Sequence, residues 1–427
     1  MSTKRVFATQ SIPGPDDIVR AELENGIVVL ARANFSSPSV TIGGWLNVGS
    51  LLDSDKRLGL ANFTALGLMR GTRDRDFHAI YNALESVGAS LGFGGGTHAT
   101  AFNGRAMVDD LDLLLSLLAD VLYRPAFPRK QIKKLRAQIL TGLALRAQST
   151  EDQAAMAFDS AVYVDHPYAR PDQGYIHTVR KMRSSHMRGF HANHYGPERT
   201  IIVIVGGIEP QQAVEKIKAV LGDWRNPHQQ LPPPLPEWQP LTEMKRVEVK
   251  VPSKSQSDLV VGTTGPTRRS PDFLAAAIGN NILGQFGLMG RIGQSLREQA
   301  GIAYYAKSNI SSSMGPGPWS VQAGVDPKDV DRAVELILKE IKNFVSELVA
   351  KEELADSKAN FIGSLPLSLE SNAGVASALM HLEKHSLGLD YYQRFPELIN
   401  SITREQVLEV AQRYLDPQRL AIAIAGP

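Results

Sequence analysis

The amino-acid sequence predicts an α+β fold made of two copies of one αβ unit. The segment "NPHQQLPPPLPEWQPL", 226–241, holds six prolines in sixteen residues and divides the chain near its middle. The stretch before it ends in "HYGPERTIIVIVGGIEP" (194–210), which resembles "RYLDPQRLAIAIAGP" (413–427) at the end of the second part. The order of predicted strands and helices is also the same on both sides of the proline-rich segment.

The proline-rich segment sets the predicted domain boundaries. Dense proline favours an extended, semi-rigid conformation over a helix or a central strand. We therefore expect an N-terminal half at 1–225, a linker at 226–241 and a C-terminal half at 242–427. More than one domain is also expected from the length of 427 residues, because single cores stop growing near about 250–300 residues.

The expected elements of the first half follow from the spacing of its apolar residues. Alternation predicts strands, and recurrence every three or four positions predicts helices. The expected strands are 26–33, 39–48 and one near 98–107, and the expected helices are 54–70, 76–88, one from Asp109 or Asp110 to about 123, 128–147 and 151–163.

Helix-start signals occur in both halves. Ser184 and Thr403, which lie 219 positions apart, are each expected to cap the helix before the last strand of their half. "SPD" at 270–272 predicts a further helix start, with Ser270 as N-cap and Pro271 in the first turn. This order of elements favours helices on a mostly antiparallel sheet over a doubly wound parallel sheet.

The composition excludes several classes of site. The chain has no cysteine, which excludes disulfides, thiolate zinc sites and cysteine nucleophiles. Its net charge of +2 is too small to indicate nucleic acid or anionic lipid as the main partner. The apolar stretch at 111–122 is too short to cross a membrane and carries two aspartates, and no signal peptide is recognised, so we expect a cytoplasmic protein.

Four stretches carry a resemblance to a known family. In order and spacing, the whole chain resembles a subunit of the pitrilysin, insulysin and mitochondrial processing peptidase family of inverted-motif zinc peptidases. The four stretches are "GLANFTALGLMRGT" (59–72), "LESVGASLGFGGGTHATAF" (84–102), "HYGPERTIIVIVGGIEP" (194–210) and "GLMGRIGQSLREQAGIAYYAKSNI" (287–310). The resemblance implies two αβ-roll halves, arranged like a clam around a chamber that a partner chain helps to close.

The zinc motif of the family is degenerate in this chain. In active members the first helix reads H-x-x-E-H, where two histidines hold zinc and the glutamate activates water. The histidine positions are Asn62 and Leu66 here, and the glutamate position is Ala65. A third ligand is expected about 75 residues later, yet the matching stretch 133–150 has no carboxylate. We therefore expect no metal in this chain and no peptide hydrolysis by it alone.

A second feature of the family is retained. In active members the C-terminal half supplies an arginine and, seven residues later, a tyrosine that reach the bound peptide, and Arg297 and Tyr304 have this spacing. An arginine can donate to peptide carbonyls, and a phenol can donate to a developing oxyanion. The alternative is a surface arginine and a half-buried core tyrosine. Arg291 and Tyr305 are weaker candidates in the same corner.

Two histidine pairs are alternative metal sites. His381 and His385 in "HLEKH" have ligand spacing, but Glu383 between them points about 200° around the helix, so a solvated helix face is favoured. His191 and His194 precede a buried strand, and packing or capping is the favoured role for both.

Two glycine-rich segments have competing interpretations. Gly284, Gly287, Gly290 and Gly293 in "GQFGLMGRIG" lack the lysine of a phosphate-binding loop, which leaves substrate handling or a simple turn. "LGFGGGTHATAF" (91–102) matches the edge strand that receives substrate in active members, but its three consecutive glycines make a poor template for strand addition.

Three functions remain after these observations. The first is a non-catalytic subunit of a heterodimeric zinc metallopeptidase, whose homologous partner carries H-x-x-E-H and the zinc while this chain contributes Arg297 and Tyr304 to peptide binding. The second is a structural subunit of the kind found in the core of the respiratory cytochrome bc complex. The third is a homodimeric peptide-binding protein.

Overall fold

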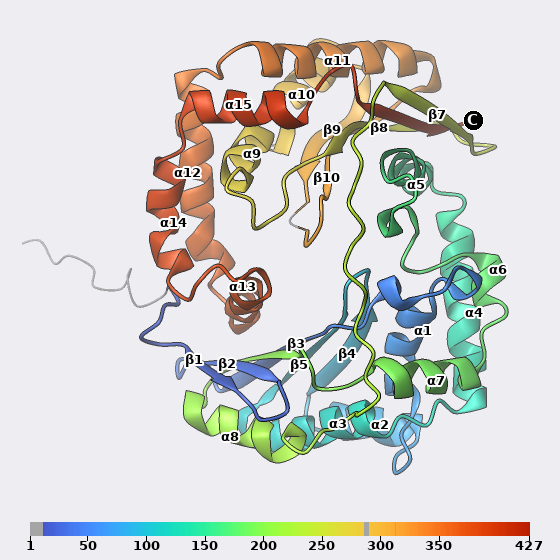
Figure 1. Ribbon diagram of the computed structural model, residues 1–427, viewed down its shortest axis with the longest axis vertical. Helices are drawn as coiled ribbons and strands as arrows, with labels where there is room; N and C mark the ends of the chain where they lie inside the picture. Colours follow the sequence, from blue (N-terminus) through green and yellow to red (C-terminus); the bar gives the residue numbers. More distant parts are fainter. Residues whose placement is uncertain (1–11, 286–289, 312) are drawn as a thin grey trace, which may run out of the picture. The chain divides into compact units, whose positions relative to one another are not determined.

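The structure of the chain is a computed structural model that describes residues 12–285, 290–311 and 313–427. Its described residues form two compact units, each with one sheet and its own helices (Figure 1). Unit 1 takes in the described part of 1–141 together with 171–234 and 365–394, and unit 2 takes in 142–170, 235–364 and 395–427. The predicted mixture of helices with mostly antiparallel strands is confirmed.

The sheet of unit 1 has six strands in the order β1-β2-β6-β3-β5-β4. Their bounds are Val19–Glu22 (β1), Val28–Ala33 (β2), Ser39–Leu46 (β3), Ser90–Gly95 (β4), Thr100–Met107 (β5) and Ile201–Gly206 (β6). The β2–β6 pair is parallel and every other pair is antiparallel. Strands β2, β3 and β5 lie at the sequence positions predicted, and β6 is the expected last strand of the first half. The resemblance implied an edge strand within 91–102, where most of β4 lies, whereas β1 was not among the expected strands.

The sheet of unit 2 repeats this topology with five strands in the order β7-β11-β8-β10-β9. Their bounds are Lys245–Lys250 (β7), Ser257–Thr264 (β8), Ala303–Ile310 (β9), Pro318–Val325 (β10) and Ala421–Gly426 (β11). The β7–β11 pair is parallel and the rest are antiparallel, as in the corresponding positions of unit 1. The duplication inferred from the sequence therefore extends to strand order and direction.

The helices also recur in the same order in the two halves of the sequence. In the first half they are α1 (Leu60–Gly67), α2 (Phe77–Glu85), α3 (Leu111–Tyr123), α4 (Arg129–Arg146), α5 (Thr150–Val162), α6 (Ile176–Val179), α7 (Ser184–His194) and α8 (Pro210–Leu221). In the second they are α9 (Phe273–Asn280), α10 (Arg291–Gly293), α11 (Val330–Ser346), α12 (Lys351–Ser368), α13 (Asn372–His385), α14 (Tyr391–Asn400) and α15 (Arg404–Tyr414). None of the described helices is long and apolar enough to span a membrane.

Helix starts match the sequence in some places and not in others. Thr403 caps α15 through a reciprocal pair of bonds with Gln406, as its position predicted. The cap predicted at Ser184 is wrong by one residue, because Arg183 is the N-cap of α7 and makes no side-chain cap bond. The start predicted at Ser270 is also early: α9 begins at Phe273, and the Ser270 hydroxyl accepts from the Asp272 amide in the preceding turn.

The compact units do not coincide with the two sequence halves. Helix α5 belongs to the first half by sequence, yet it packs on β8 and β11 of unit 2. Helix α13 belongs to the second half, yet it packs on β3 and β6 of unit 1. The boundary predicted at 226–241 could not include this exchange of helices between the two halves. An amphipathic pattern shows that one face of a helix is buried, but it does not show which sheet covers that face.

The core of unit 2 shows why α5 is needed. All eight residues of β8 and all six of β11 are buried, so both faces of these strands must be covered. Ala154, Phe158 and Val162 of α5 join the alanines of β11 in one apolar cluster. The proline-rich segment, which has no helix or strand as predicted, adds Trp238, whose indole N–H donates to the Val162 carbonyl at 3.1 Å.

Phe158→Ala should destabilise unit 2 by about 3–5 kcal/mol, because the ring is 2% exposed and its removal leaves a cavity. Ser160→Ala is the matched control on the exposed side of the same helix and should cost under about 0.5 kcal/mol. Urea unfolding followed by tryptophan fluorescence measures both. Equal effects of the two changes would contradict the packing of α5 on this sheet.

Asp159 predicts a pH-dependent stability. Burial raises the pKa of Asp159 to about 7, so the folded chain holds a proton there that the unfolded chain releases near its ordinary pKa of 3.8. The contribution of Asp159 to stability is therefore greatest below pH 4 and declines as the pH rises to 7. Asp159→Asn should remove this decline, so the variant gains on wild type by up to about 4 kcal/mol between pH 4 and pH 8. Paired unfolding curves across this range measure the difference.

Candidate functional site

Helix α1, which carries the zinc-motif positions, is fixed at its start by a buried carboxylate. Asp53 is 6% exposed, and its two oxygens accept from the Gly59 and Ala61 amides at 2.7 and 2.9 Å. These amides are among the unpaired N–H groups of the first helical turn, where negative charge is stabilising. Gly59 has a φ of +93°, which favours glycine at the entry to the helix. The frame of the motif is thus intact.

The zinc-motif positions themselves hold no set of donors that fits zinc. Asn62 and Leu66 lie one turn apart and are half-buried, and Ala65 is fully buried between them. The Asn62 side-chain oxygen accepts from the Gly95 amide of β4 at 3.4 Å, which ties α1 to the edge strand. A neutral amide, a methyl and an isobutyl group supply no charged or imidazole ligand. Zinc does not fit here.

The segment expected to hold a third ligand lies on α4 and offers no carboxylate. The side-chain oxygen of Gln138 on this helix accepts from Arg70, just after α1, at 2.9 Å. Residues 121–150 contain no Asp or Glu. Among the residues that the structure describes, no cluster of three or more His, Asp or Glu side chains has a geometry that could hold a metal ion.

Strand β4 forms the free edge of the unit 1 sheet and pairs with β5 only. A Cβ on Gly92 or Gly94 would meet no atom within 4 Å, so neither glycine is required by crowding. Gly95 differs, since a Cβ there would lie 2.5 Å from Cα of Asn62. The glycines therefore serve the close approach of α1 at Gly95 and leave positions 92 and 94 of the edge strand without side chains.

Arg297 and Tyr304 lie at one corner of unit 2. Arg297 is exposed on the π-helical segment Gln294–Gln299, which packs against β9. Gly301 has a φ of +65° and follows the end of this segment, where a left-handed glycine is common. Tyr304 is the second residue of β9 and is 61% exposed. Both side chains are free for a ligand, because neither makes a hydrogen bond or ion pair with any described residue.

Tyr305, the next residue of β9, points to the opposite side of the strand and is held there by a buried carboxylate. Its hydroxyl donates to Asp258 at 2.7 Å, and Asp258, 2% exposed, also accepts from the Thr150 hydroxyl at 2.5 Å. Burial, and then the charge of Asp258, raises the pKa of Tyr305. These hydrogen bonds fix the start of β9, and with it the backbone that carries Tyr304.

Arg291 forms a half-buried ion pair with Glu353. Its guanidinium makes two bonds of 2.7 Å to the Glu353 carboxylate and lies 5.7 Å from the centre of the Phe344 ring. Bonding to Glu353 raises the pKa of Arg291. This bidentate, half-buried pair uses two of the five N–H donors of the guanidinium. A substrate contact by Arg291 therefore stays a prediction, as the weaker candidate beside Arg297.

Two of the glycines in 284–293 meet at close range. A Cβ on Gly290 would lie 2.7 Å from Cα of Gly284, so glycine is needed at this crossing of the backbone. Gly287 lies outside the described residues. Close packing of the backbone is therefore the role that the structure shows for Gly284 and Gly290.

The histidine pairs are accounted for by neighbouring residues. The His381 and His385 rings lie 4.7 Å apart, while Glu383 forms a two-bond ion pair with Arg20 and so points away from them. The solvated helix face expected for this pair is wrong at His385, which is 2% exposed. His191 bonds to the Leu122 carbonyl at 2.8 Å and stacks on Tyr195, and burial lowers the pKa of His191 to about 4. His194 contacts the Gln230 carbonyl. The packing and capping roles expected of His191 and His194 are confirmed.

Comparisons with known proteins point to one peptidase family. A family profile described as "Insulinase (Peptidase family M16)" matches residues 28–172, and a profile described as "Peptidase M16 inactive domain" matches residues 181–361. A protein of Mycobacterium leprae named an uncharacterized zinc protease is 24% identical over 410 residues, which cover 96% of this chain and 92% of that protein.

Two further similarities bear on fold and role. Subunit 1 of the human mitochondrial cytochrome b-c1 complex is 26% identical over 266 residues, which cover 62% of this chain and 55% of that protein. The crystal structure of a peptidase M16 inactive domain from Pseudomonas fluorescens matches with a TM-score of 0.89 at 23% identity, and the match covers 96% of this chain and 98% of the other. This last likeness shows the fold.

The donor set of α1 predicts that the purified chain carries far less than one zinc per chain. The reason is that Asn62 and Leu66 replace both imidazoles and Ala65 replaces the carboxylate. Metal analysis after gel filtration in zinc-containing buffer measures this, with an H-x-x-E-H protein handled in parallel as the positive control. One firmly held zinc per chain would contradict the assignment of these positions.

Proposed function

This chain belongs to peptidase family M16, and from that premise we propose that it is the non-catalytic subunit of a heterodimeric zinc metallopeptidase. The observation that carries the proposal is selective loss. Every residue type needed for zinc and for water activation is replaced on α1, whereas Arg297 and Tyr304 keep the family spacing in unit 2.

The surroundings of Arg297 and Tyr304 support a role in substrate contact. Both side chains are exposed and have no partner among the described residues, so neither has to give up an internal bond to meet a peptide. Arg297 offers up to five N–H donors to peptide carbonyls or a carboxylate. The Tyr304 hydroxyl offers one donor to the oxygen that becomes negative during attack on the scissile carbonyl.

The partner in this proposal is a homologous subunit that carries H-x-x-E-H. That subunit holds the zinc, which supplies the activated water and polarises the scissile carbonyl when bound. The two chains enclose the peptide in a clam-like arrangement, and this chain orients it through Arg297 and Tyr304. When both chains hold the peptide in the reactive geometry, the entropic part of the activation free energy is lower.

A structural subunit is the second candidate function. The observation that favours it is the 26% identity to subunit 1 of the cytochrome b-c1 complex over 266 residues. In that case assembly requires this chain, but Arg297 and Tyr304 are dispensable. A homodimer that binds peptides is the third, and it predicts peptide affinity without any partner.

Co-expression with an H-x-x-E-H homologue tests the proposal. Peptidase activity should appear only in the mixed complex, and Arg297→Ala should lower it mainly by raising KM. Tyr304→Phe keeps the ring and removes only the donor, so it should lower kcat by about a hundredfold. Arg332→Ala, an exposed arginine on α11, is the matched control and should leave the activity unchanged.

The outcomes separate the candidates. Complex formation with full activity in Arg297→Ala and Tyr304→Phe would support the structural role and exclude substrate contact by this pair. Peptide binding by the isolated chain, measured by fluorescence anisotropy, together with a homodimer in analytical ultracentrifugation, would favour the third function.

A further inference from the structure

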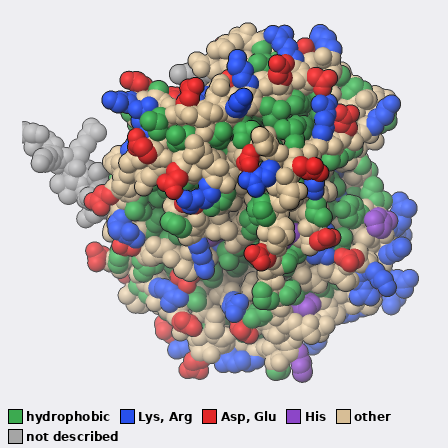
Figure 2. Space-filling view, turned by 45° about the horizontal axis from the view of Figure 1, so that its top comes forward, with side chains coloured by type: hydrophobic (Ala, Val, Ile, Leu, Met, Phe, Trp, Pro, Cys, Tyr) green, Lys and Arg blue, Asp and Glu red, His purple; other side chains and the backbone are tan. Residues whose placement is uncertain are grey.

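The small net charge of the chain conceals a strongly basic face on unit 1. Residues 121–150 contain seven basic residues and no acidic one, and residues 173–197 contain four basic residues and no acidic one. The first segment includes most of α4 and the second includes all of α7. Figure 2 shows basic side chains gathered on the right of the molecule, on the side where α4 and α7 lie in Figure 1.

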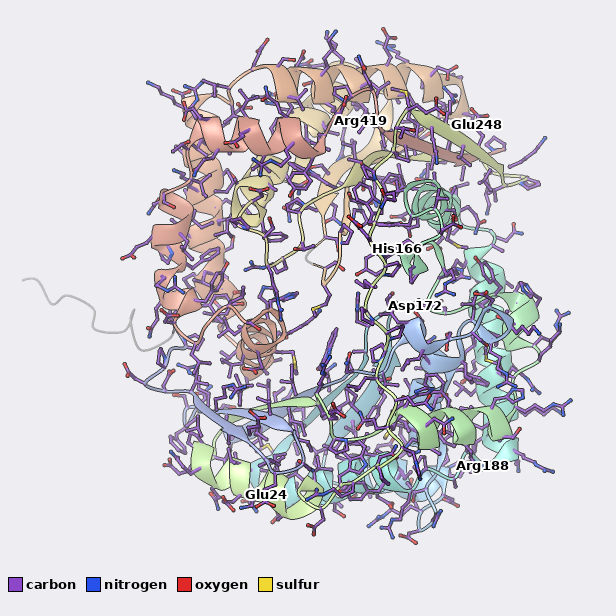
Figure 3. All side chains as sticks on the ribbon, viewed as in Figure 1. Glu24, His166, Asp172, Arg188, Glu248 and Arg419 are labelled. Carbon is purple, nitrogen blue, oxygen red and sulfur yellow. The ribbon has the colours of Figure 1, made fainter. Side chains whose placement is uncertain are left out.

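These two helices line a pocket of about 470 Å³ between them. Its lining has five cationic side chains, two serines and one isoleucine, and it has no carboxylate. The lining residues are Arg129, Ile132, Lys133, Arg136, Arg183, Ser184, Ser185 and Arg188. Figure 3 labels Arg188, which extends from α7. A pocket of this volume has the size of a site for a small ligand.

None of the five cations forms an ion pair with a described residue. By contrast, Arg20, Arg291 and Arg394 elsewhere in the described chain each have a carboxylate oxygen within 3 Å. Two of them are positioned by backbone carbonyls. Arg136 donates to the Met182 carbonyl at 2.8 Å, and Arg188 donates to the Ala126 carbonyl at 3.3 Å. After burial, the charges of Arg57 and Arg183 also lower the pKa of the neighbouring His186. Positive charge therefore accumulates here without internal neutralisation.

The second copy of the fold provides an internal comparison. In unit 2 the counterparts of α4 and α7 are α12 and α15, and Lys358 of α12 donates to the Asn400 carbonyl at 2.9 Å, as Arg136 does to Met182. The cation that holds these helices is thus part of the fold. The first turns of α12, however, carry Glu352, Glu353 and Asp356 in place of an all-basic surface. The all-basic surface of unit 1 therefore has no counterpart on α12.

The start of α7 adds amide donors to this pocket. Arg183, the N-cap, makes no side-chain cap bond, whereas Thr403 caps the corresponding helix in unit 2. The amides of Ser184 and Ser185 donate to no residue in the described part of the chain, and Ser184 is 7% exposed. Unpaired first-turn amides and the helix dipole favour an anion at this position.

We propose that the pocket between α4 and α7 binds a multiply charged oxyanion of the phosphate class. Five cations exceed what a single carboxylate can neutralise, and planar guanidinium groups match phosphate oxygens in pairs. The serine hydroxyls and first-turn amides supply the neutral donors that such an oxyanion accepts. The site is independent of the proposed peptidase role, since it shares no residue with α1 or β9.

Isothermal titration of the full chain with inorganic pyrophosphate tests this site. One molecule should bind per chain, and the affinity should fall steeply as salt rises from 50 to 300 mM because the contacts are ionic. Arg183→Gln combined with Arg188→Gln should weaken binding at least tenfold. Arg332→Gln combined with Lys339→Gln removes the same charge from α11 and is the matched control, expected to stay within twofold of wild type.

Circular dichroism melts of both double variants establish that they fold, so a loss of binding reports on the pocket. No binding of pyrophosphate at 50 mM salt, or equal weakening by the two double variants, would overturn the proposal. Tighter binding of a hexaglutamate peptide than of pyrophosphate would also overturn it, in favour of an acidic protein partner. Binding to phosphatidylglycerol vesicles that pyrophosphate cannot displace would assign the basic face to a lipid surface and overturn the pocket as well.

Discussion

Burial of each sheet on both faces is the constraint from which the rest of the structure follows. Strands β6, β8 and β11 consist almost entirely of buried residues, so helices on one face alone would leave apolar surface in water. The second face is covered by α5 in unit 2 and by α13 in unit 1, each contributed by the other half of the sequence. Neither half can therefore complete its own core, and the long helices α4 and α12 must extend from one unit into the other. Edge strands β4 and β9 each pair with a strand on one side only. The zinc-motif positions lie beside β4, and Arg297 and Tyr304 lie at β9.

The same frame carries two very different chemistries. Helix α1 packs on β4 through Asn62 and Gly95 and keeps a well-capped start, although its reactive side chains are gone. Its counterpart α9 is apolar throughout its first turns and offers no metal ligand there. The corner of unit 2 shows the opposite arrangement, since Tyr305 is fixed to Asp258 while Tyr304 beside it is exposed. Rigid support on one side of a strand and a free donor on the other is how a binding residue is held in position.

Much of this organisation could be predicted from local patterns. Strands β2, β3 and β5 and the cap at Thr403 depend on residues close in sequence. What could not be predicted depends on partners far away. The pair between Arg291 and Glu353 joins residues 62 positions apart, and nothing in "GLMGRIG" distinguishes a buried pair from a substrate contact. Strand β4 escaped the element pattern because glycine weakens strand signals even where pairing imposes the strand.

The duplication itself provides the sharpest separation of structural from functional residues. A contact that both copies make, such as Arg136 to Met182 and Lys358 to Asn400, serves the fold, because the two copies have little else in common at these positions. A feature found in one copy alone has no such explanation. The uncapped start of α7 and its surrounding arginines have no counterpart at α15, where Thr403 and Gln406 complete the cap. Unneutralised cations repel one another and cost stability, so their retention in one copy indicates a ligand that offsets the repulsion. Average composition gives no sign of this, since the acidic residues that balance the chain lie elsewhere.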